Sequence, residues 1–551
     1  MLCWLAAVAM SPAVVASAAA RDNALHVSFA SDASVRLQGQ RFVARTRSDA
    51  AAVNDAVARE GAVRIQRLVE ESPASLDAVR GSLLARGKRG VPDLNRHYRI
   101  VTSSRVARDR LLADLRALAV VETAILEPEP APPPATRDFT SQQRYGFAAP
   151  GGIGVAAITG LGGGLGQNVK IVDVEYSWNR SHEDLAKAAP AATVIANGIV
   201  ADPFNDNNHG TAVLGELVAT ANKFGVTGLA QGSALGVVNA YSSDVGYTPA
   251  NAVNLARQNL SAGDVILLEQ QWQGIPGTGS EAVAYVPSEY LDSVYDAVKL
   301  ATQSGIIVVE AAGNGGVNLD NAAYTAPFPG GKSDSGAIIV GAGSGDCSAP
   351  ANSRLSFSTY GARVNLQGWG QCVTTTGYGG LFNGGTNARY TKTFNGTSSA
   401  APIVASAAAL FSSVFQARAP GGRAPTPQAV RKRLVDTGTA QGAGGHIGPL
   451  PNVAVATTNF DFTPPTVTFS SGPTGTTTDA TPTFAFAASE GSSTLECRVD
   501  ADEFAACVSP LTTDQLGDGQ HTLEVKATDA ALNPGSPASR VFTVDTTAPP
   551  V

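Results

Sequence analysis

The sequence of 551 residues predicts an α/β domain with a mostly parallel sheet and helices on both faces, preceded by a small α+β domain and followed by an all-β sandwich. Three observations predict this order. Short apolar runs alternate with helical patterns between residues 138 and 458, a Pro-rich segment precedes that region, and alternating Thr-, Ser- and Gly-rich segments follow it.

The overall composition narrows the class of protein. Hydrophobic residues make up 44% of the chain and charged residues 15%, against about 25% in ordinary globular proteins, so a substantial core is expected. The net charge is −7, which argues against a nucleic-acid binder held by a basic surface. Beyond the N-terminus no apolar run approaches 18 residues, so no membrane span is expected.

The N-terminus has the features of an export signal. Residues 1–20 carry no charge and end in Ala16-Ser17-Ala18-Ala19-Ala20, which fits the small-residue rule for signal peptidase at residue 18 or 20. We therefore expect a signal peptide over 1–20 and a secreted or extracellular protein, with attachment to a bacterial cell surface left open. The alternative is a buried N-terminal helix.

Residues 21–137 predict a small α+β domain and its exit linker. His97–Val101 reads as a strand, Val106–Leu118 as a helix with leucines on one face, and Val120–Leu126 as a second strand. The Pro-rich segment 127–134 must be extended and is expected to act as a stiff linker.

The central domain, residues 138–458, is predicted from buried strands and the helices between them. The expected strands are Val169–Val172, Val265–Leu268, Ile306–Val309 and Ile338–Val340, and the expected helices are Glu289–Thr302, Ser399–Phe415 and Pro427–Val435. Such continuous apolar strands are typical of parallel sheets covered on both faces.

Residues 463–548 change to alternating β-formers separated by turns. The expected strands are Thr466–Phe469, Thr483–Phe486 and Thr522–Val525, which predict a β-sandwich. The segment beginning at Val544 resembles the entry to this domain at Phe462, so we expect that the chain stops where another repeat once began.

The cysteines predict disulfides in an exported chain. Cys3 lies in the expected signal, which leaves Cys347, Cys372, Cys497 and Cys507 with three possible pairings. The local pairing, Cys347 with Cys372 and Cys497 with Cys507, is favoured because each pair then lies within one domain.

Three short segments of the central domain carry chemistry. Asp173 ends a buried strand, His209 lies in Asn-His-Gly-Thr before a helical pattern, and Ser398 lies in Asn-Gly-Thr-Ser-Ser-Ala-Ala-Pro at the start of an Ala-rich helix. A serine hydroxyl becomes a nucleophile when a histidine takes its proton, and the histidine needs a carboxylate to hold its tautomer. The chain order Asp, His, Ser is one of the known orders of this triad.

These motifs resemble the subtilisin-like serine peptidases, the subtilase family. The resemblance implies that Ser398 is the nucleophile, His209 the general base, Asp173 the orienting carboxylate and Asn314, in Ala-Gly-Asn-Gly, an oxyanion donor. It also implies that the domain in 21–137 is a propeptide that inhibits the enzyme until it is removed. The segments around Cys497 and Cys507 resemble bacterial Ig-like repeats, which bind a surface or another protein, or act as spacers.

The sequence departs from the family pattern where the substrate is bound. Asp173 is followed by Val-Glu instead of Ser/Thr-Gly, Glu269 stands where the family often has Ser-Leu-Gly-Gly, and Glu310 replaces a small apolar residue. By alignment with the family, Glu269 and Glu310 are expected to lie near the pocket for the residue before the scissile bond. Two carboxylates there would favour Arg or Lys in the substrate, whereas the alternative is that both acids are buried and only hold the loops.

The sequence therefore predicts a secreted serine endopeptidase made as a zymogen that hydrolyses protein or peptide substrates and needs no cofactor for its chemistry. The alternative is a secreted adhesin in which the protease fold is inactive and the Ig-like module carries the function. Structural calcium is left open, because the loop of Asp202, Asn205, Asp206 and Asn207 has suitable ligand types but such loops are commonly only solvated.

Overall fold

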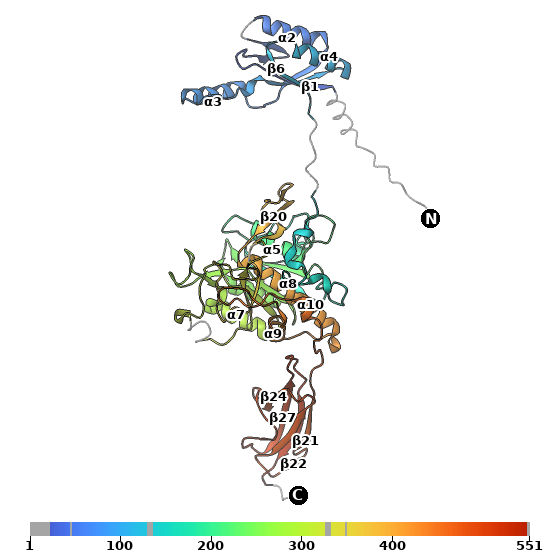
Figure 1. The fold of residues 1–551 in the computed structure, drawn as a ribbon, viewed down its shortest axis with the longest axis vertical. Coiled ribbons are helices and arrows are strands. Elements are labelled where there is room, and N and C mark those ends of the chain that lie inside the picture. Colours follow the sequence, from blue (N-terminus) through green and yellow to red (C-terminus); the bar gives the residue numbers. More distant parts are fainter. Residues whose placement is uncertain (1–22, 45–46, 129–135, 325–331, 348–349, 548–551) are drawn as a thin grey trace, which may run out of the picture. The chain divides into compact units, whose positions relative to one another are not determined.

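The computed structural model describes residues 23–44, 47–128, 136–324, 332–347 and 350–547, which Figure 1 draws as a ribbon. The chain divides into two compact units, Met1–Pro132 and Pro133–Val551. The predicted signal peptide (1–20) and most of the Pro-rich linker lie outside the described residues.

The first unit is an antiparallel sheet with helices packed on it, which confirms the predicted α+β domain. The sheet order is β4-β5-β1-β6. Helix α4 packs on this sheet because Leu111, Leu112 and Leu115 recur on one face and are buried. The elements are β1 (Ala24–Phe29), β2 (Arg36–Gln38), β3 (Arg41–Val43), α2 (Arg47–Arg59), β4 (Ala62–Arg67), α3 (Pro73–Ala85), β5 (His97–Thr102), α4 (Arg105–Arg116) and β6 (Val121–Leu126).

A seven-stranded sheet forms the centre of the second unit, and all of its neighbouring strands run parallel. In sheet order the strands are β17 (Leu366–Trp369), β16 (Ile338–Gly343), β15 (Ile307–Ala311), β12 (Val265–Leu268), β7 (Lys170–Glu175), β9 (Ala234–Asn239) and β8 (Val194–Ile195). The predicted parallel sheet is therefore confirmed. Strand β7 lies inside the sheet, between β12 and β9, and continues three residues further than the pattern predicts.

Helices cover both faces of this sheet, as the sequence predicts. Helices α5 (Asn208–Val218) and α8 (Thr397–Arg418) share one core with side chains such as Ile171 and Leu267. Helices α6 (Pro249–Gln258) and α7 (Asp292–Gln303) share the other core with side chains such as Val172. Helices α9 (Pro427–Thr437) and α10 (Val453–Ala456) complete the first layer.

Small antiparallel sheets extend from the central one. They are β10 (Tyr241–Ser242) with β11 (Gly246–Tyr247), β13 (Gln271–Gln273) with β14 (Tyr285–Pro287), and β18 (Val373–Thr376), β20 (Arg389–Phe394) and β19 (Phe382–Asn383). Strand β20 leads directly into α8, so its last residues help to position the N-terminus of that helix.

Helix α8 is the central helix of the core. It has 22 residues and a stretch of mean hydropathy 1.5, which makes it, within the described residues, the one helix long and apolar enough to cross a membrane. That whole stretch is buried inside the fold, as expected for the core helix of a globular domain.

The C-terminal part consists of two β-sheets that share one hydrophobic core, which confirms the all-β prediction. Phe484 and Phe486 come from one sheet, and Leu523 and Val525 from the other. The strands are β21 (Val467–Ser471), β22 (Thr476–Thr477), β23 (Thr483–Ala488), β24 (Thr494–Val499), β25 (Ala505–Ala506), β26 (Leu511–Thr512), β27 (Gly519–Thr528) and β28 (Ala538–Val544).

Both disulfides have the predicted local pairing. Cys347 is bonded to Cys372 in the central domain, and Cys497 is bonded to Cys507 in the C-terminal sandwich. Each bridge therefore closes a short loop within one domain.

Candidate active site

Strand β7 brings two acids to the same side of the sheet. Side chains alternate along a strand, so Asp173 and Glu175 share the face that Ile171 turns toward α5 and α8. Both acids are buried, with exposed fractions of 0% and 2%. Glu175 is the last residue of the strand and therefore lies at its carboxyl end, where ligand sites of parallel sheets form.

His209 is held by Glu175. It is the second residue of α5, and its Nδ1 atom forms a short hydrogen bond with the Glu175 carboxylate. Gly210 allows this approach, because a Cβ atom there would lie 2.7 Å from Glu175 Cγ and 2.4 Å from the Ser177 carbonyl oxygen. The prediction that Asp173 orients His209 is thus corrected, since the carboxylate at the imidazole is Glu175.

Asp173 lies deeper along β7 and has a different partner. One of its oxygens accepts a hydrogen bond from Trp178 Nε1 at 2.7 Å, and its other oxygen has no partner among the described residues. Burial raises the pKa of Asp173 well above its usual value, and the neighbouring Glu175 raises it further. Asp173 therefore lies behind the His–Glu pair, in surroundings that favour its protonated form.

The electrostatics of His209 fit a base supported by a carboxylate. Burial lowers the pKa of His209, but Glu175, through its charge and its hydrogen bond, together with Asp173 and Asp206, raises it above the usual value. The ring also packs edge-on against Phe394, with centroids 5.6 Å apart. Glu175 consequently fixes the Nδ1–H tautomer, which leaves Nε2 free to accept a proton.

Ser398 occupies the N-terminus of α8, as predicted. It is the second residue of the helix, where backbone N–H groups have no acceptor within the helix. Gly396 directly precedes the helix with a φ of +103°, and a Cβ atom there would lie 3.3 Å from Asn314 Nδ2. A glycine is therefore needed both for the backbone conformation and for the space in front of Asn314.

Asn314 is oriented by the same turn. Its Oδ1 accepts hydrogen bonds from the Thr397 N–H at 2.8 Å and the Thr397 hydroxyl at 3.1 Å. Its own N–H donates to Gln271 Oε1 at 2.8 Å. Because Oδ1 is occupied, the Nδ2 group is the part of the side chain left to donate into the cavity.

One cavity of about 1090 Å³ brings these residues together. Ser398, His209, Glu175 and Asn314 all line it, whereas Asp173 does not. Within the described residues, no hydrogen bond joins the Ser398 and His209 side chains, and such contacts often tighten only when substrate binds.

Aromatic and acidic side chains form the rest of the cavity wall. The Trp272 and Tyr247 rings stack 6.1 Å apart with an interplanar angle of 5°. The other lining aromatics are Tyr176, Phe204, Tyr241, Tyr285, Tyr378 and Phe394. The lining carboxylates are Glu175, Asp202, Asp206 and Glu269, and the described lining includes no Lys or Arg. The cavity therefore combines large apolar surfaces with negative potential.

Glu310 lies on the other face of the sheet, so the prediction that it forms part of the substrate pocket is wrong. Its neighbours along β15, Val309 and Ala311, belong to the core under α8, so Glu310 itself turns toward the opposite core. There it is fully buried and accepts a hydrogen bond from the Glu289 N–H at 2.9 Å.

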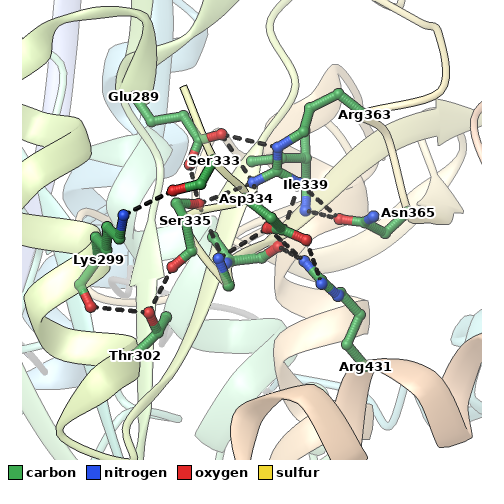
Figure 2. A network of polar contacts seen from close by, with 12 residues as sticks. Glu289, Lys299, Thr302, Ser333, Asp334, Ser335, Ile339, Arg363, Asn365 and Arg431 are labelled. Carbon is green, nitrogen blue, oxygen red and sulfur yellow. Dashed lines mark hydrogen bonds and ion pairs between the residues drawn. The ribbon is translucent and has the colours of Figure 1, made fainter. Parts of the chain in front are cut away.

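Glu289, whose N–H donates to Glu310, belongs to a network of charged and polar side chains that Figure 2 shows. Glu289 forms a buried ion pair with Arg363 at 2.7 Å, and Asp334 forms an ion pair with Arg431. Burial and the charge of Glu289 raise the pKa of Glu310 well above its usual value. The network thus holds loops together behind the sheet, as the alternative in the sequence analysis proposed for this acid.

Glu269 does lie at the cavity, as predicted. It follows the last residue of β12 and is 5% exposed. Burial, followed by the charges of Glu175 and Asp173, raises the pKa of Glu269 well above its usual value. The raised pKa of Glu269 weakens the expected attraction for Arg or Lys in the substrate, and Glu310, on the other face of the sheet, does not line the cavity.

The acidic side chains of the loop before His209 accept hydrogen bonds from backbone N–H groups of the same loop. Asp202 accepts hydrogen bonds from the N–H groups of Phe204 and Asp206, and Asp206 accepts one from Asn208. Among the described residues, the acids grouped closely enough to share a cation are Asp461, Glu490 and Asp529, with ligand atoms within 4.8 Å of one another. Both oxygens of Asp529 already accept hydrogen bonds from Asn533, so this buried acid has partners without a cation.

The fold and this site define a serine hydrolase with a parallel α/β core. A family model described as the subtilase family matches residues 166–461, and the chain belongs to that family. It is a subtilisin-like serine endopeptidase.

Curated relatives agree with this assignment. Subtilisin from Bacillus pumilus is 32% identical over 299 residues, which are 53% of this chain and 92% of that protein. Subtilisin DY from Bacillus licheniformis is 33% identical over 297 residues, covering 53% of this chain and 91% of its own. Among solved structures, a protease from Pseudoalteromonas arctica PAMC 21717 covers 59% of this chain and 99% of its own, with 19% identity and a TM-score of 0.41.

Sequence reasoning missed Glu175, although a signal for it was present. Asp173 and Glu175 alternate on one strand face, and the acid nearer the carboxyl end is the one that reaches the edge where α5 begins. The predicted strand stopped at Val172 because an acid was taken to end it, whereas β7 buries both acids.

Proposed function

We propose that this endopeptidase works through Ser398 as nucleophile, His209 as general base and Glu175 as orienting carboxylate, with Asn314 as an oxyanion donor. The observation that carries the proposal is the hydrogen bond between His209 Nδ1 and Glu175 at a cavity that Ser398 and Asn314 also line. Glutamate replaces the aspartate that the resemblance implied, and its longer side chain reaches the imidazole from the last residue of β7.

In the acylation step, the Ser398 Oγ attacks the carbonyl carbon of the scissile peptide bond while His209 Nε2 takes the hydroxyl proton. The Glu175 carboxylate stabilises the imidazolium by accepting the Nδ1–H hydrogen bond. The oxyanion that forms is met by the free N–H of Ser398 at the helix N-terminus and by Asn314 Nδ2.

Collapse of the tetrahedral intermediate breaks the carbon–nitrogen bond, and His209 returns its proton to the leaving amine. A water molecule then attacks the acyl-enzyme ester, again with its proton going to His209, and Ser398 recovers its proton when the carboxylic acid product leaves. No step in this sequence requires a cofactor.

We propose that the chain is secreted as a zymogen and that the domain in residues 21–137 is its own inhibitor. The charge-free segment 1–20, the two disulfides and the separate compact unit Met1–Pro132 support this. The natural substrates are proteins or peptides, and the Ig-like module binds a surface or another protein. Structural calcium has its most suitable donors at Asp461, Glu490 and Asp529.

The Ser398→Ala variant tests the assignment directly. It should lose peptide hydrolysis and labelling by a fluorophosphonate probe while its circular dichroism stays unchanged, because only a hydroxyl is removed. If maturation is autocatalytic, the precursor also stays uncut between residues 127 and 140. Full activity in this variant would overturn the proposal, and a wild-type chain that the probe never labels would favour the adhesin.

A further inference from the structure

Glu269 is placed by its strand directly beside the catalytic groups. Its N–H donates to the Val174 carbonyl at 3.2 Å, so it lies next to Glu175 on the neighbouring strand. Leu267, two residues earlier, belongs to the core under α8, so the alternation along β12 turns Glu269 toward the helix that carries Ser398. Both Glu269 and Ser398 line the cavity.

The Glu269 carboxyl group has no other partner. Both of its oxygens are shielded from solvent, and neither forms a hydrogen bond of ordinary geometry within the described residues. The Ser398 hydroxyl is a neighbour of this carboxyl group, because it acts through side-chain hydrogen bonding to lower the pKa of Glu269, against the larger raising effect of burial. Leaving a buried polar group without a partner destabilises the fold, and a hydrogen bond with the Ser398 hydroxyl would give this carboxyl group one.

The burial of this carboxyl group and the acids beside it favour its protonated form. The titratable groups that face it are Asp173 and Glu175 from β7 and Glu216 and His209 from α5. Burial is the largest effect on the pKa of Glu269, and the three acids raise it further. A carboxyl group that keeps its proton is a hydrogen-bond donor as well as an acceptor.

On the basis of the proposed role of Ser398 as the nucleophile, we propose that the Glu269 carboxyl group donates a hydrogen bond to the Ser398 Oγ atom and acts as a further catalytic residue. The Ser398 hydroxyl keeps its own proton for His209 Nε2, because an Oγ atom donates one hydrogen bond and accepts others. As that proton leaves, the bond from Glu269 strengthens and stabilises the developing negative charge on Oγ. The Glu269 proton stays on Glu269 throughout.

Two substitutions distinguish the hydrogen bond that Glu269 donates from the space that its side chain fills. Glu269→Gln keeps a neutral donor of the same length, and Glu269→Met keeps the length without a donor. We expect Glu269→Gln to label with a fluorophosphonate within about 3-fold of the wild-type rate at neutral pH. We expect Glu269→Met to lose about 10–10²-fold in both labelling rate and kcat, with little change in KM.

The pH profile provides a second readout. Wild-type labelling should fall at alkaline pH, where Glu269 ionises and its donor is lost, whereas Glu269→Gln should lack this fall because an amide does not titrate there. Glu216→Met is the matched control, since Glu216 is a buried acid of the same cluster on α5 that lies outside the cavity. It should leave the labelling rate unchanged.

Several outcomes would overturn the inference. One is a labelling rate in Glu269→Met equal to that of the wild type. A second is an alkaline fall in the labelling rate of Glu269→Gln equal to that of the wild type. A third is a change confined to the ratio of kcat/KM for Arg and Leu peptides, which would mean that Glu269 only lines the substrate pocket. If Glu269→Met does not fold, the profile of Glu269→Gln decides alone. Failure of the proposed function differs from all of these, because the wild type itself would then not be labelled at Ser398.

Discussion

Replacing Glu175 by Gln tests which of the two acids of β7 serves as the carboxylate partner of His209. Within the part of the chain that the structure describes, the charged partner bonded to His209 Nδ1 is the Glu175 carboxylate, whose side chain is 3% exposed, so water offers little replacement. The amide of Gln can present its NH₂ group to Nδ1 and thereby favour the wrong imidazole tautomer. In a triad, the equivalent change of carboxylate to amide costs about 10⁴-fold in kcat, which is about 5.4 kcal/mol of transition-state stabilisation.

Asp173→Asn is the matched control. Burial raises the pKa of Asp173, which favours its neutral form, and the Asn oxygen can still accept the hydrogen bond from Trp178 Nε1. We therefore expect a loss of less than about 10-fold in kcat, because the variant keeps the Trp178 partner and resembles the favoured form of the acid. Both variants should be compared with the wild type by the hydrolysis of a fluorogenic peptide, with active sites titrated to correct for misfolded protein.

The acid limb of the pH profile of kcat/KM gives an independent test of the same assignment. Glu175 raises the pKa of His209, and the base is lost when the pH falls below that pKa, so removing the Glu175 charge should move the acid limb of kcat/KM to lower pH. A loss of about 10⁴-fold in Asp173→Asn, together with near-normal activity in Glu175→Gln, would refute the assignment of Glu175.

The remaining predictions concern the oxyanion site and stability. Asn314→Ala should lower kcat about 10²–10³-fold with little change in KM, measured by steady-state kinetics, and a main effect on KM would remove it from the oxyanion site. Glu216→Met, in the Ser398→Ala background, should raise the urea unfolding midpoint, and more so at pH 8 than at pH 5. The reason is that burial raises the pKa of Glu216, so its stabilising contribution is complete below the unfolded pKa and is lost as pH rises; an equal midpoint shift at both values contradicts this. Arg363→Met should lower the free energy of unfolding by about 3–5 kcal/mol, because Glu289 is left buried without its charge partner. Lys432→Ala breaks an exposed ion pair with Asp436 and should lower it by less than about 0.5 kcal/mol. Equal losses in the two variants would refute this difference.

The sequence by itself was enough to predict the fold class and three of the four side chains at the site. Apolar strands such as Val265–Leu268 and the Ala-rich helix at Ser398 are local patterns, because burial on both faces of a sheet leaves a continuous apolar run. The motifs around His209, Asn314 and Ser398 are local as well, since each sits at the end of its own strand or helix. The cysteine pairs followed from domain limits.

Only the tertiary structure decided which acid reaches His209 and which acid faces Ser398. Asp173 and Glu175 are two residues apart on one strand face, so no local pattern distinguishes them, and the choice depends on where α5 begins relative to the end of β7. Glu269 follows the apolar strand β12, and Glu310 lies within the apolar strand β15. The alternation of side chains along these strands turns Glu269 toward α8 and Glu310 toward the opposite core. The physical reason is that strand register, fixed by pairing between β7, β12 and β15, sets the face of each acid, and register is a property of neighbouring strands.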